Sequence, residues 1–293
     1  MSYDVVIVGG GPAGLSAALA LGRARKRVLV CDAGPRRNAA AVHIHNFVTR
    51  DGTPPEEFRQ IGRQQLTTYP NVEVRDTGVT SIGGSRGAFE VALASGTITA
   101  RRILLCTGMI DEMVPLPSFR ELWGHAIVQC PYCHGWEARD QRWGYLAFPH
   151  VTGHLLKFAQ HLRGWTRDVT VFTQGVVDAG EVRAANIPNV RIEVAPVTRL
   201  VPGAVELATG TSVPIDLLFS HPPQYQVPLV TSLGLALEDG MVKVEPMSRE
   251  TSVPGIFAAG DLTTRAQGAM FAAAAGTQAA TAINLELTIE QPL

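Results

Sequence analysis

Apolar runs near the start of the chain predict two buried strands with a helix between them. Residues 3–8 and 27–32 are short and rich in β-branched side chains, which is typical of parallel strands that are covered on both faces. Residues 15–21 are small and apolar, which favours a helix packed closely on those strands. This order of elements predicts a βαβ unit at the beginning of the fold.

The same layout recurs in the middle of the chain. Residues 143–148 and 169–173 predict strands, and residues 153–162 predict the helix between them. The sequence therefore predicts an α/β fold with two Rossmann-like three-layer domains. We expect the first domain to be discontinuous, over residues 1–112 and 240–293, and the second to span residues 113–239.

Further elements are expected inside the first domain. A helix with a capped, acidic N-terminal end is predicted from about residue 51 to 68. A buried strand is predicted over residues 102–108, and a long alanine-rich helix over residues 268–283. A small antiparallel sheet is predicted from three alternating segments, residues 72–74, 89–93 and 97–100.

A glycine pattern, Gly9-x-Gly11-x-x-Gly14, stands where the first strand meets the first helix. Gly9 suits a tight turn, Gly11 the close approach of a pyrophosphate, and Gly14 close packing of helix on strand. Asp32 ends the second strand, where a carboxylate accepts hydrogen bonds from a ribose. The combination predicts a dinucleotide site; the alternative is a glycine turn without a ligand.

Two cysteines in the sequence Cys130-Pro131-Tyr132-Cys133-His134 predict a redox pair. Residues three apart on a first helical turn share a face, so their sulfur atoms can close a disulfide ring. Pro131 fits the first helical position, which places Cys130 at the helix cap, where backbone N–H groups favour a thiolate. His134 adds a group that exchanges protons near neutral pH. A zinc half-site completed by His134 and His125 is the alternative, although no second ligand pair follows at the usual spacing.

The second βαβ unit lacks the glycines of the first. Its junction reads Phe148-Pro149-His150-Val151-Thr152-Gly153, and no arginine cluster follows its second strand to pair with a 2′-phosphate. We therefore expect NADPH not to bind there in the usual mode. The alternative is that a divergent loop still binds NADPH. Three aromatic side chains and a histidine from this region either fill the vacated pocket or stack the ring of another cofactor: Trp143, Tyr145, Phe148 and His150.

Composition narrows the class of protein. The chain has 293 residues, 46% of them hydrophobic, and a net charge of −1, which does not favour binding to nucleic acid or an anionic membrane. The apolar N-terminal segment has no positive region and carries Asp4, so we expect a cytoplasmic protein without a signal peptide. No membrane helix is expected. Cys31 and Cys106 lie in apolar runs and are expected in the core.

The motifs taken together resemble those of low-molecular-weight thioredoxin reductases. They are, in order, the N-terminal glycines, a strand that ends in Cys106-Thr107-Gly108, the inserted cysteine pair, and Gly260-Asp261. The resemblance implies FAD in the first domain with Asp261 at the flavin, Cys133 facing the isoalloxazine and Cys130 exchanging disulfides with the substrate. His134 stands where those reductases have an acid-base aspartate. The expected cofactor-binding residues are Gly9, Gly11, Pro12, Ala13, Gly14, Asp32, Asn38, His45, Thr107, Gly108, Gly260, Asp261, Gln267, Gly268 and Ala269.

The cysteine segment is most similar to a branch of this family that lacks the NADPH motif. That branch includes the dithiol oxidases of the gliotoxin and holomycin pathways and disulfide reductases linked to ferredoxin or a second flavin. The resemblance implies an FAD-dependent dithiol/disulfide oxidoreductase, homodimeric, whose substrate is a small dithiol or a thioredoxin-like protein and whose redox partner is oxygen, ferredoxin or a second flavin. The alternatives are an NADPH-dependent thioredoxin reductase with a divergent loop and a non-catalytic flavin-binding redox sensor.

Overall fold

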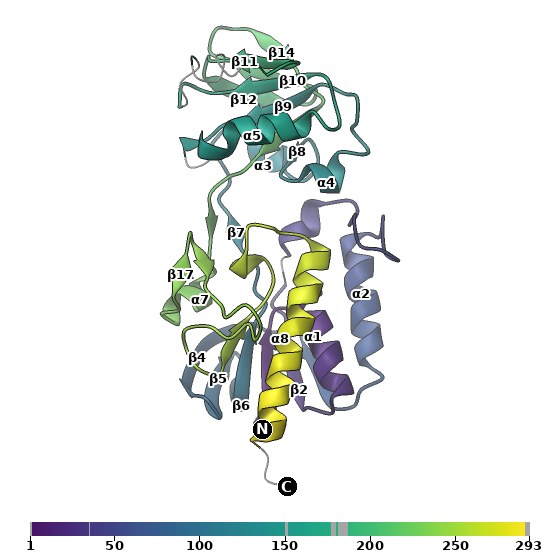
Figure 1. The fold of residues 1–293 in the computed structure, drawn as a ribbon, viewed down its shortest axis with the longest axis vertical. Helices are drawn as coiled ribbons and strands as arrows, with labels where there is room; N and C mark the ends of the chain where they lie inside the picture. Colours follow the sequence, from purple (N-terminus) through teal and green to yellow (C-terminus); the bar gives the residue numbers. More distant parts are fainter. Residues whose placement is uncertain (1, 35, 150–151, 177–179, 181–186, 291–293) are drawn as a thin grey trace. The chain divides into compact units, whose positions relative to one another are not determined.

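The structure is a computed structural model that describes residues 2–34, 36–149, 152–176, 180 and 187–290. The chain forms two compact units (Figure 1). The first unit contains Met1–Ala39, Phe47–Ile110 and Gln224–Leu293, and the second contains Ala40–Asn46 and Asp111–Pro223. Each unit has a parallel sheet, so the predicted α/β fold with two Rossmann-like units is confirmed. The functional domain boundaries at residues 112 and 240 stay predictions.

A seven-stranded sheet forms the centre of the first unit, in the order β3-β2-β1-β6-β5-β4, with β19 paired to β6. Strands β3, β2, β1 and β6 are parallel, and β4 and β5 continue the sheet as antiparallel strands. The strands are β1 (Ser2–Val8), β2 (Val28–Cys31), β3 (Val72–Arg75), β4 (Val79–Ser85), β5 (Ala88–Leu93), β6 (Gly96–Leu105) and β19 (Ile256–Ala258).

The structure corrects two expectations about this sheet. Residues 72–74 were predicted in a small antiparallel sheet, but β3 pairs in parallel with β2, because the helix between them returns the chain to the same end of the sheet. Residues 97–100 and 102–105 form one strand, β6, rather than two. Its first half pairs with β5 and its second half with β19, so one strand joins the antiparallel and parallel parts.

Three helices, α1 (Pro12–Arg23), α2 (Pro55–Leu66) and α8 (Ala269–Ile289), lie side by side on one face of this sheet (Figure 1). Alternate residues of β1 explain the two faces: Val5 and Ile7 pack with the helices, and Val6 and Val8 pack in the core on the other face. That opposite face is covered in part by α7 (Pro228–Ser232). The predicted C-terminal helix exists and continues to Ile289, beyond the predicted end at residue 283.

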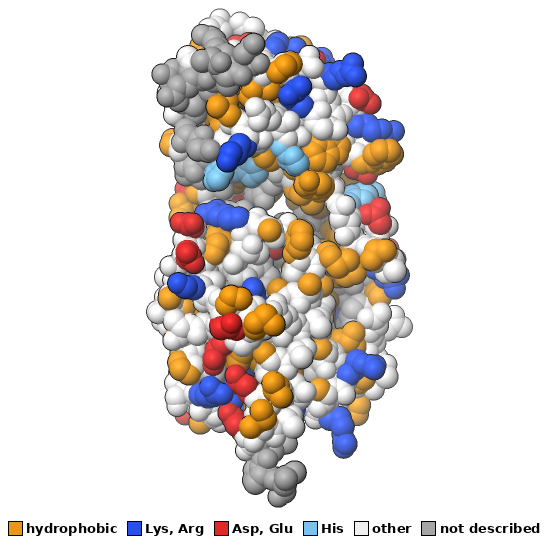
Figure 2. Space-filling model, in the orientation of Figure 1, with side chains coloured by type: hydrophobic (Ala, Val, Ile, Leu, Met, Phe, Trp, Pro, Cys, Tyr) orange, Lys and Arg blue, Asp and Glu red, His pale blue; other side chains and the backbone are white. Residues whose placement is uncertain are grey.

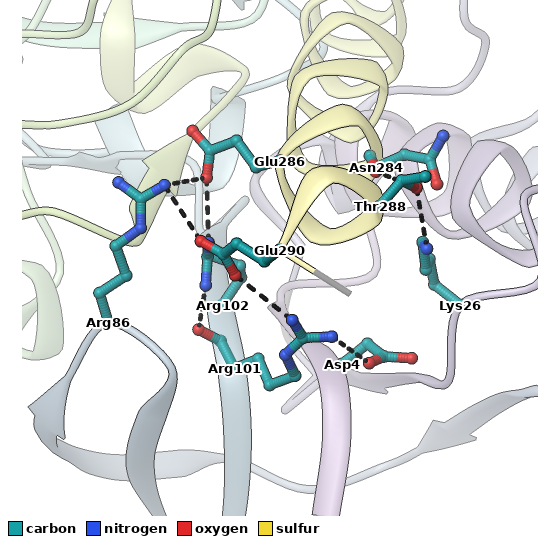
Figure 3. A network of polar contacts seen from close by, with 9 residues as sticks. All are labelled: Asp4, Lys26, Arg86, Arg101, Arg102, Asn284, Glu286, Thr288 and Glu290. Carbon is teal, nitrogen blue, oxygen red and sulfur yellow. Dashed lines mark hydrogen bonds and ion pairs between the residues drawn. The ribbon is translucent and has the colours of Figure 1, made fainter. Parts of the chain in front are cut away.

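An ionic network fixes the end of α8 to the sheet (Figure 3). Arg102 on β6 is fully buried; its Nε lies 3.0 Å from a carboxylate oxygen of Glu286, and its guanidinium also contacts Glu290. Arg86 contacts the same two carboxylates and Arg101 contacts Glu290, both from more exposed positions. The buried guanidinium is therefore compensated by carboxylates that water still reaches.

The second unit contains a five-stranded parallel sheet in the order β11-β10-β9-β15-β8. Helix α5 (Thr152–Leu162) packs on one face of this sheet, and a three-stranded antiparallel sheet covers the other. The parallel strands are β8 (Ile127–Val128), β9 (Trp143–Leu146), β10 (Val169–Phe172), β11 (Val190–Glu193) and β15 (Leu217–Ser220). The covering strands are β12 (Val197–Val201), β13 (Ala204–Leu207) and β14 (Ser212–Pro214).

Short elements complete the description. They are η1 (Arg37–Ala40), β7 (Ile110–Asp111), α3 (Phe119–Leu122), α4 (Pro131–His134), β16 (Gln224–Tyr225), β17 (Leu237–Glu238), β18 (Met241–Val242) and η3 (Asp261–Thr263). Three of them, η1, α4 and η3, carry residues that the sequence analysis selected.

The surface carries charges of both signs. On the face drawn in Figure 2, acidic and basic side chains are interspersed rather than gathered into one patch of a single sign. Within the described ranges, no helix is both long and apolar enough to cross a lipid bilayer.

Candidate active site

The predicted glycines of the first unit lie at the turn from β1 into α1. Gly9 has a φ of +111°, and a Cβ there would lie 2.2 Å from the carbonyl oxygen of Cys106. A Cβ on Gly14 would lie 1.9 Å from the Gly9 carbonyl oxygen. These two positions require glycine for the turn and for close packing. Gly11 differs, because no atom lies within 4 Å of the Cβ it would carry, so the space in front of it is open.

The N-terminal end of α1 offers its backbone N–H groups to an anion. Gly11 is the N-cap and brings no side chain to bond them, Pro12 follows it, and the first turn contains no acidic residue. A helix of this length with an open N-terminus favours a negatively charged group such as a pyrophosphate. Ala13, the next residue, is small, and Gly276 of α8 passes so close that its Cβ would lie 2.1 Å from the Ala13 carbonyl oxygen.

Asp32 follows β2 directly and is 7% exposed. Arg59 of α2 donates two hydrogen bonds to its Oδ2, at 3.0 Å from Nε and 2.7 Å from Nη2. No hydrogen bond from the described residues reaches Oδ1, so this oxygen is available to a ribose hydroxyl. Sequence analysis missed Arg59 and also Gly10, whose Cβ would lie 2.5 Å from Oδ2 of Asp32. The spacing of Arg59 and Arg63 on one helix face was a usable signal for a basic partner.

Asp261 begins η3 just after β19, next to Gly260, whose φ is +94°. Arg37 donates to Asp261 Oδ2 at 2.9 Å and to Gln267 Oε1 at 2.6 Å. The amide of Gln267 in turn donates to Gln224 Oε1 at 2.9 Å. Two predicted residues, Asp261 and Gln267, are thus held together by Arg37 and Gln224, which the sequence analysis did not select.

The remaining predicted cofactor residues of the first unit lie near these groups in the chain. Asn38 follows Arg37 on η1, and Thr107 and Gly108 follow the end of β6, where Gly108 has a φ of +66°. Gly268 is the N-cap of α8 and Ala269 its first residue, and no acid stands in the first turn of α8. An open glycine at a helix N-terminus, a carboxylate after β2 and a second carboxylate after β19 fit the pyrophosphate, ribose and ribityl groups of FAD.

The cysteine pair of the second unit begins α4 as predicted. Cys130 is the N-cap with a φ of −121°, Pro131 is the first helical residue, and the Cys133 N–H donates to the Cys130 carbonyl at 3.1 Å. Neither cysteine forms a disulfide, and both are partly exposed. A hydrogen bond from the Cys133 side chain, aided by the backbone N–H groups of Cys133 and Tyr132, lowers the pKa of Cys130 to about 7 against the effect of burial. Cys130 is therefore the better nucleophile near neutral pH.

Cys31 and Cys106 behave differently. Burial raises the pKa of Cys31 to about 11 and raises the pKa of Cys106 well above its ordinary value. Both are buried in the first unit, as expected for core residues. Among the described residues, no three His, Cys, Asp or Glu side chains come together as a metal ion would require.

His134 is the last residue of α4, and its Nδ1 is buried without a hydrogen bond of ordinary geometry among the described residues. Burial lowers the pKa of His134, the Cys130 backbone and Glu137 act in the opposite direction, and His45 adds to the lowering. His45 was predicted as a cofactor residue. The structure places it in the second unit, with Nε2 at 3.6 Å from Oε1 of Glu137.

The junction after β9 can be compared with the junction after β1 by their registers. Val8 pairs with Cys31, and the next N–H, of Gly9, donates to the Cys31 carbonyl. Leu146 pairs with Phe172, and the next N–H, of Ala147, donates to the Phe172 carbonyl. This register places Ala147 at the position of Gly9, and counting along the chain from there matches Pro149 to Gly11 and Thr152 to Gly14. By the same count, α5 begins two residues later than α1, at Thr152. His150 and Val151 lie outside the described residues.

The same comparison pairs Thr173 with Asp32, since each N–H after the second strand donates to the last residue of the third, at 2.8 Å and 3.0 Å respectively. The Thr173 hydroxyl donates to the Glu193 carbonyl at 3.3 Å, so the carboxylate of the first unit is replaced by a neutral group. Gln174, the next residue, donates from its side chain to the Ala147 carbonyl at 3.1 Å.

Aromatic side chains fill the space between β9, β15 and α5. The rings of Tyr145 and His221 both pack on Phe158, with centroids 4.7 Å apart in each case, and the Tyr145 hydroxyl lies 3.3 Å from His221 Nδ1. Trp143 and Tyr145 are 0% and 1% exposed. Of the aromatic residues selected for a second flavin, these two therefore belong to the core, while Phe148 is partly buried against the opposite face of the sheet.

A glycine cradle for a dinucleotide in one Rossmann-like unit and a Cys-x-x-Cys pair in another define a flavin-dependent disulfide oxidoreductase. Residues 3–152 match the family described as pyridine nucleotide-disulphide oxidoreductase, and the chain belongs to this family.

Similar proteins cover almost the whole chain. A probable thioredoxin reductase of Arthroderma benhamiae is 32% identical over 99% of this chain and 81% of its own length. The crystal structure of an oxidoreductase from Agrobacterium tumefaciens is 35% identical, with a TM-score of 0.93 over 99% of this chain and all of that one. The crystal structure of HlmI is 34% identical, with a TM-score of 0.90 over 99% of this chain and 93% of that one. The protein is a thioredoxin reductase-like, FAD-dependent oxidoreductase with a redox-active cysteine pair.

Proposed function

We propose that the protein is an FAD-dependent dithiol/disulfide oxidoreductase that works through Cys130 and Cys133 and does not use NADPH. The observation that carries the proposal is the contrast between the two βα junctions. The first has an open glycine at a helix N-terminus, and the second has Pro149 at the corresponding position. Proline has no N–H to donate and fills the space that a pyrophosphate needs.

Other features of the second unit support the same conclusion. NADPH sites pair the 2′-phosphate with an arginine after the second strand, and residues 173–176, which follow β10, contain none. The hydroxyl of Thr173 is already bonded to the backbone. Tyr145, Phe158 and His221 pack together beside β9 and β15, where the strand order changes and where doubly wound sheets bind ligands. A nicotinamide cofactor would have to displace packed aromatic side chains.

The cysteine pair can carry out balanced disulfide exchange. The Cys130 thiolate attacks one sulfur of a substrate disulfide, forms a mixed disulfide and releases the first substrate thiolate. The Cys133 sulfur, after losing its proton, attacks Cys130, releases the second substrate thiolate and closes the Cys130–Cys133 disulfide, so two electrons pass to the substrate. A dithiol substrate runs the same steps backwards and leaves the pair reduced. His134 is the group beside the pair that accepts and returns these protons.

FAD supplies the two-electron carrier that restores the pair after each cycle. The residues that would hold it are those of the glycine cradle with Asp32 and Asp261. The proposal includes a small dithiol or thioredoxin-like protein as substrate, oxygen, ferredoxin or a second flavin as redox partner, a homodimeric assembly and a cytoplasmic location.

NADPH-dependent thioredoxin reduction is the second candidate, because the matched family is named for pyridine nucleotides and the curated relative is called a probable thioredoxin reductase. The divergent junction would then bind NADPH in another way. This candidate differs from the proposal only in its electron donor.

Anaerobic titration of the oxidised holoprotein separates the two candidates. We expect a small dithiol such as dithiothreitol to bleach the flavin absorbance near neutral pH, and one equivalent of NADPH to leave it unchanged over minutes. The Cys130→Ser variant should lose the response to dithiol. Admission of air should restore the absorbance with one peroxide per dithiol if oxygen is the partner, and reduced ferredoxin should bleach the flavin if ferredoxin is. Rapid bleaching by stoichiometric NADPH would overturn the proposal.

A further inference from the structure

Loop 40–46, the segment Ala40–Asn46, belongs to the second unit although the chain on both sides of it belongs to the first. The loop is fixed at both ends. Ala40 lies against Gly124, where an added Cβ would come within 2.5 Å of the Ala40 side chain. The Asn46 amide donates to the carbonyl of Tyr132, the residue between the two cysteines.

His45, the sixth residue of the loop, brings an ionisable side chain to the segment that follows α4. His45 Nε2 lies 3.6 Å from Glu137 Oε1, and Glu137 follows His134 by three residues, at the end of α4. Glu137 and His45 are the side chains whose charges act on His134, while His43 contacts His45 edge-on at a ring-centroid distance of 5.9 Å. The backbone of Cys130 also acts on His134, and it raises the pKa of the ring. The buried Nδ1 of His134 makes no hydrogen bond of ordinary geometry among the described residues.

We propose that loop 40–46 is part of the redox centre, where His45 and Glu137 act as opposed positioning charges that control whether His134 is protonated. This inference rests on the proposed redox role of Cys130 and Cys133. The negative charge of Glu137 favours a protonated ring, and a protonated His45 disfavours it. While the two are paired, their effects on His134 largely cancel, and the loop keeps them paired.

The consequence for the chemistry is a defined destination for the thiol proton. When a cysteine thiol of the pair becomes a thiolate, its proton passes to the neutral His134 ring, and it leaves for solvent past the Glu137 carboxylate, whose side chain is half exposed. Asn46 holds the loop against α4, because its side-chain amide donates to the carbonyl of Tyr132, which lies between the two cysteines.

The test is an NMR titration of the histidine rings in the ¹⁵N-labelled, reduced holoprotein, with His134 assigned from the His134→Gln variant. Glu137→Gln leaves His45 uncompensated and should lower the pKa of His134. His45→Gln leaves Glu137 uncompensated and should raise it. We expect shifts of about half a pH unit in opposite directions, which is the size typical of partly exposed charge pairs. His43→Gln is the matched control, and it should leave the titration of His134 unchanged.

Asn46→Ala provides a second test that removes no charge. Release of the loop should reproduce the shift seen in His45→Gln, because His45 then leaves Glu137. Shifts in the same direction for Glu137→Gln and His45→Gln, or no shift in His45→Gln, would overturn the inference. The titration needs no turnover, so a failure of the proposed oxidoreductase activity would be seen separately, in the flavin-bleaching assay.

Discussion

The low pKa of Cys130 leads to a quantitative prediction for Cys133→Ala. The side chain of Cys133 is the main cause that lowers the pKa of Cys130 to about 7, with smaller help from backbone N–H groups. Alanine removes that donor and keeps the helix. We expect the pKa of Cys130 to rise toward the ordinary thiol value of about 8.5. The thiolate is present above the pKa and is lost below it, so the variant should lose reactivity mainly between pH 5.5 and 8.

The size of the effect follows from two opposing factors. If the whole shift is lost, the thiolate fraction at pH 7 falls from about one half to about 3%, a factor of roughly 16. A thiolate of higher pKa is intrinsically more nucleophilic, by a factor of roughly 5 for this change. The alkylation rate of Cys130 should therefore fall about threefold at pH 7 and about sixfold at pH 5.5. The midpoint of the pH profile is the sharper measure.

The assay is iodoacetamide alkylation of the reduced protein between pH 5 and 9.5, with the modified residue located by mass spectrometry. Cys133→Ser is the matched control, because its hydroxyl still donates to the Cys130 sulfur and should hold the midpoint near that of the unaltered protein. A midpoint that stays near 7 in Cys133→Ala would refute the reasoning and assign the shift to the helix N-terminus alone. The reduced protein should also gain stability as pH rises from about 7 to 8.5, because the thiolate is favoured in the folded state.

Three further outcomes are expected. Arg102→Met should lower the free energy of unfolding by about 3 kcal/mol in urea titrations, because it leaves two carboxylates without their buried partner. Arg86→Met, at an exposed position of the same network, should lower the free energy of unfolding by under about 1 kcal/mol. Gly11→Val should leave the fold intact but yield protein without flavin absorbance, while Gly83→Val, where an added Cβ also meets nothing within 4 Å, should retain the flavin. Arg37→Ala should weaken FAD binding about tenfold in a fluorescence titration, since a charge-assisted hydrogen bond to the carboxylate after β19 is lost; unchanged affinity would contradict that role.

Local sequence patterns predicted the elements that depend on neighbouring residues. The glycine turn after β1 and the cap at Cys130 are set by steric limits within a few residues, and the structure has both where they were predicted. Residues 72–74 were assigned to a strand correctly, but their partner was wrong, because alternation of side chains does not say which strand lies beside which. The path of the chain through α2 decides that pairing.

Long-range contacts explain what the sequence did not reveal about the candidate site. Arg37 reaches Asp261 and Gln267 across most of the chain length, and Gln224 reaches Gln267 from 43 residues away, so no spacing rule links them. His45 stays a predicted cofactor residue, but no local pattern indicated that its loop contacts Tyr132 and Glu137 in the second unit. Loop 40–46 is part of the second unit through contacts with Gly124 and Tyr132, which are far away from it in sequence and which no local pattern predicts.

Under the proposal that NADPH does not bind the second unit, the two βα junctions explain how a Rossmann-like unit keeps its fold without a dinucleotide. Both units keep the same register between their first two strands, which depends on buried apolar residues on each face of the sheet. Gly9 is required by its own surroundings, since a side chain there would meet the Cys106 carbonyl, whereas Ala147 is accommodated at the matching position. No neighbouring atom would contact a side chain at Gly11, so packing does not require glycine there and a bound ligand would. Pro149, its counterpart by count along the chain, is therefore compatible with a folded second unit, and under the proposed function it stands where only a bound pyrophosphate would need glycine.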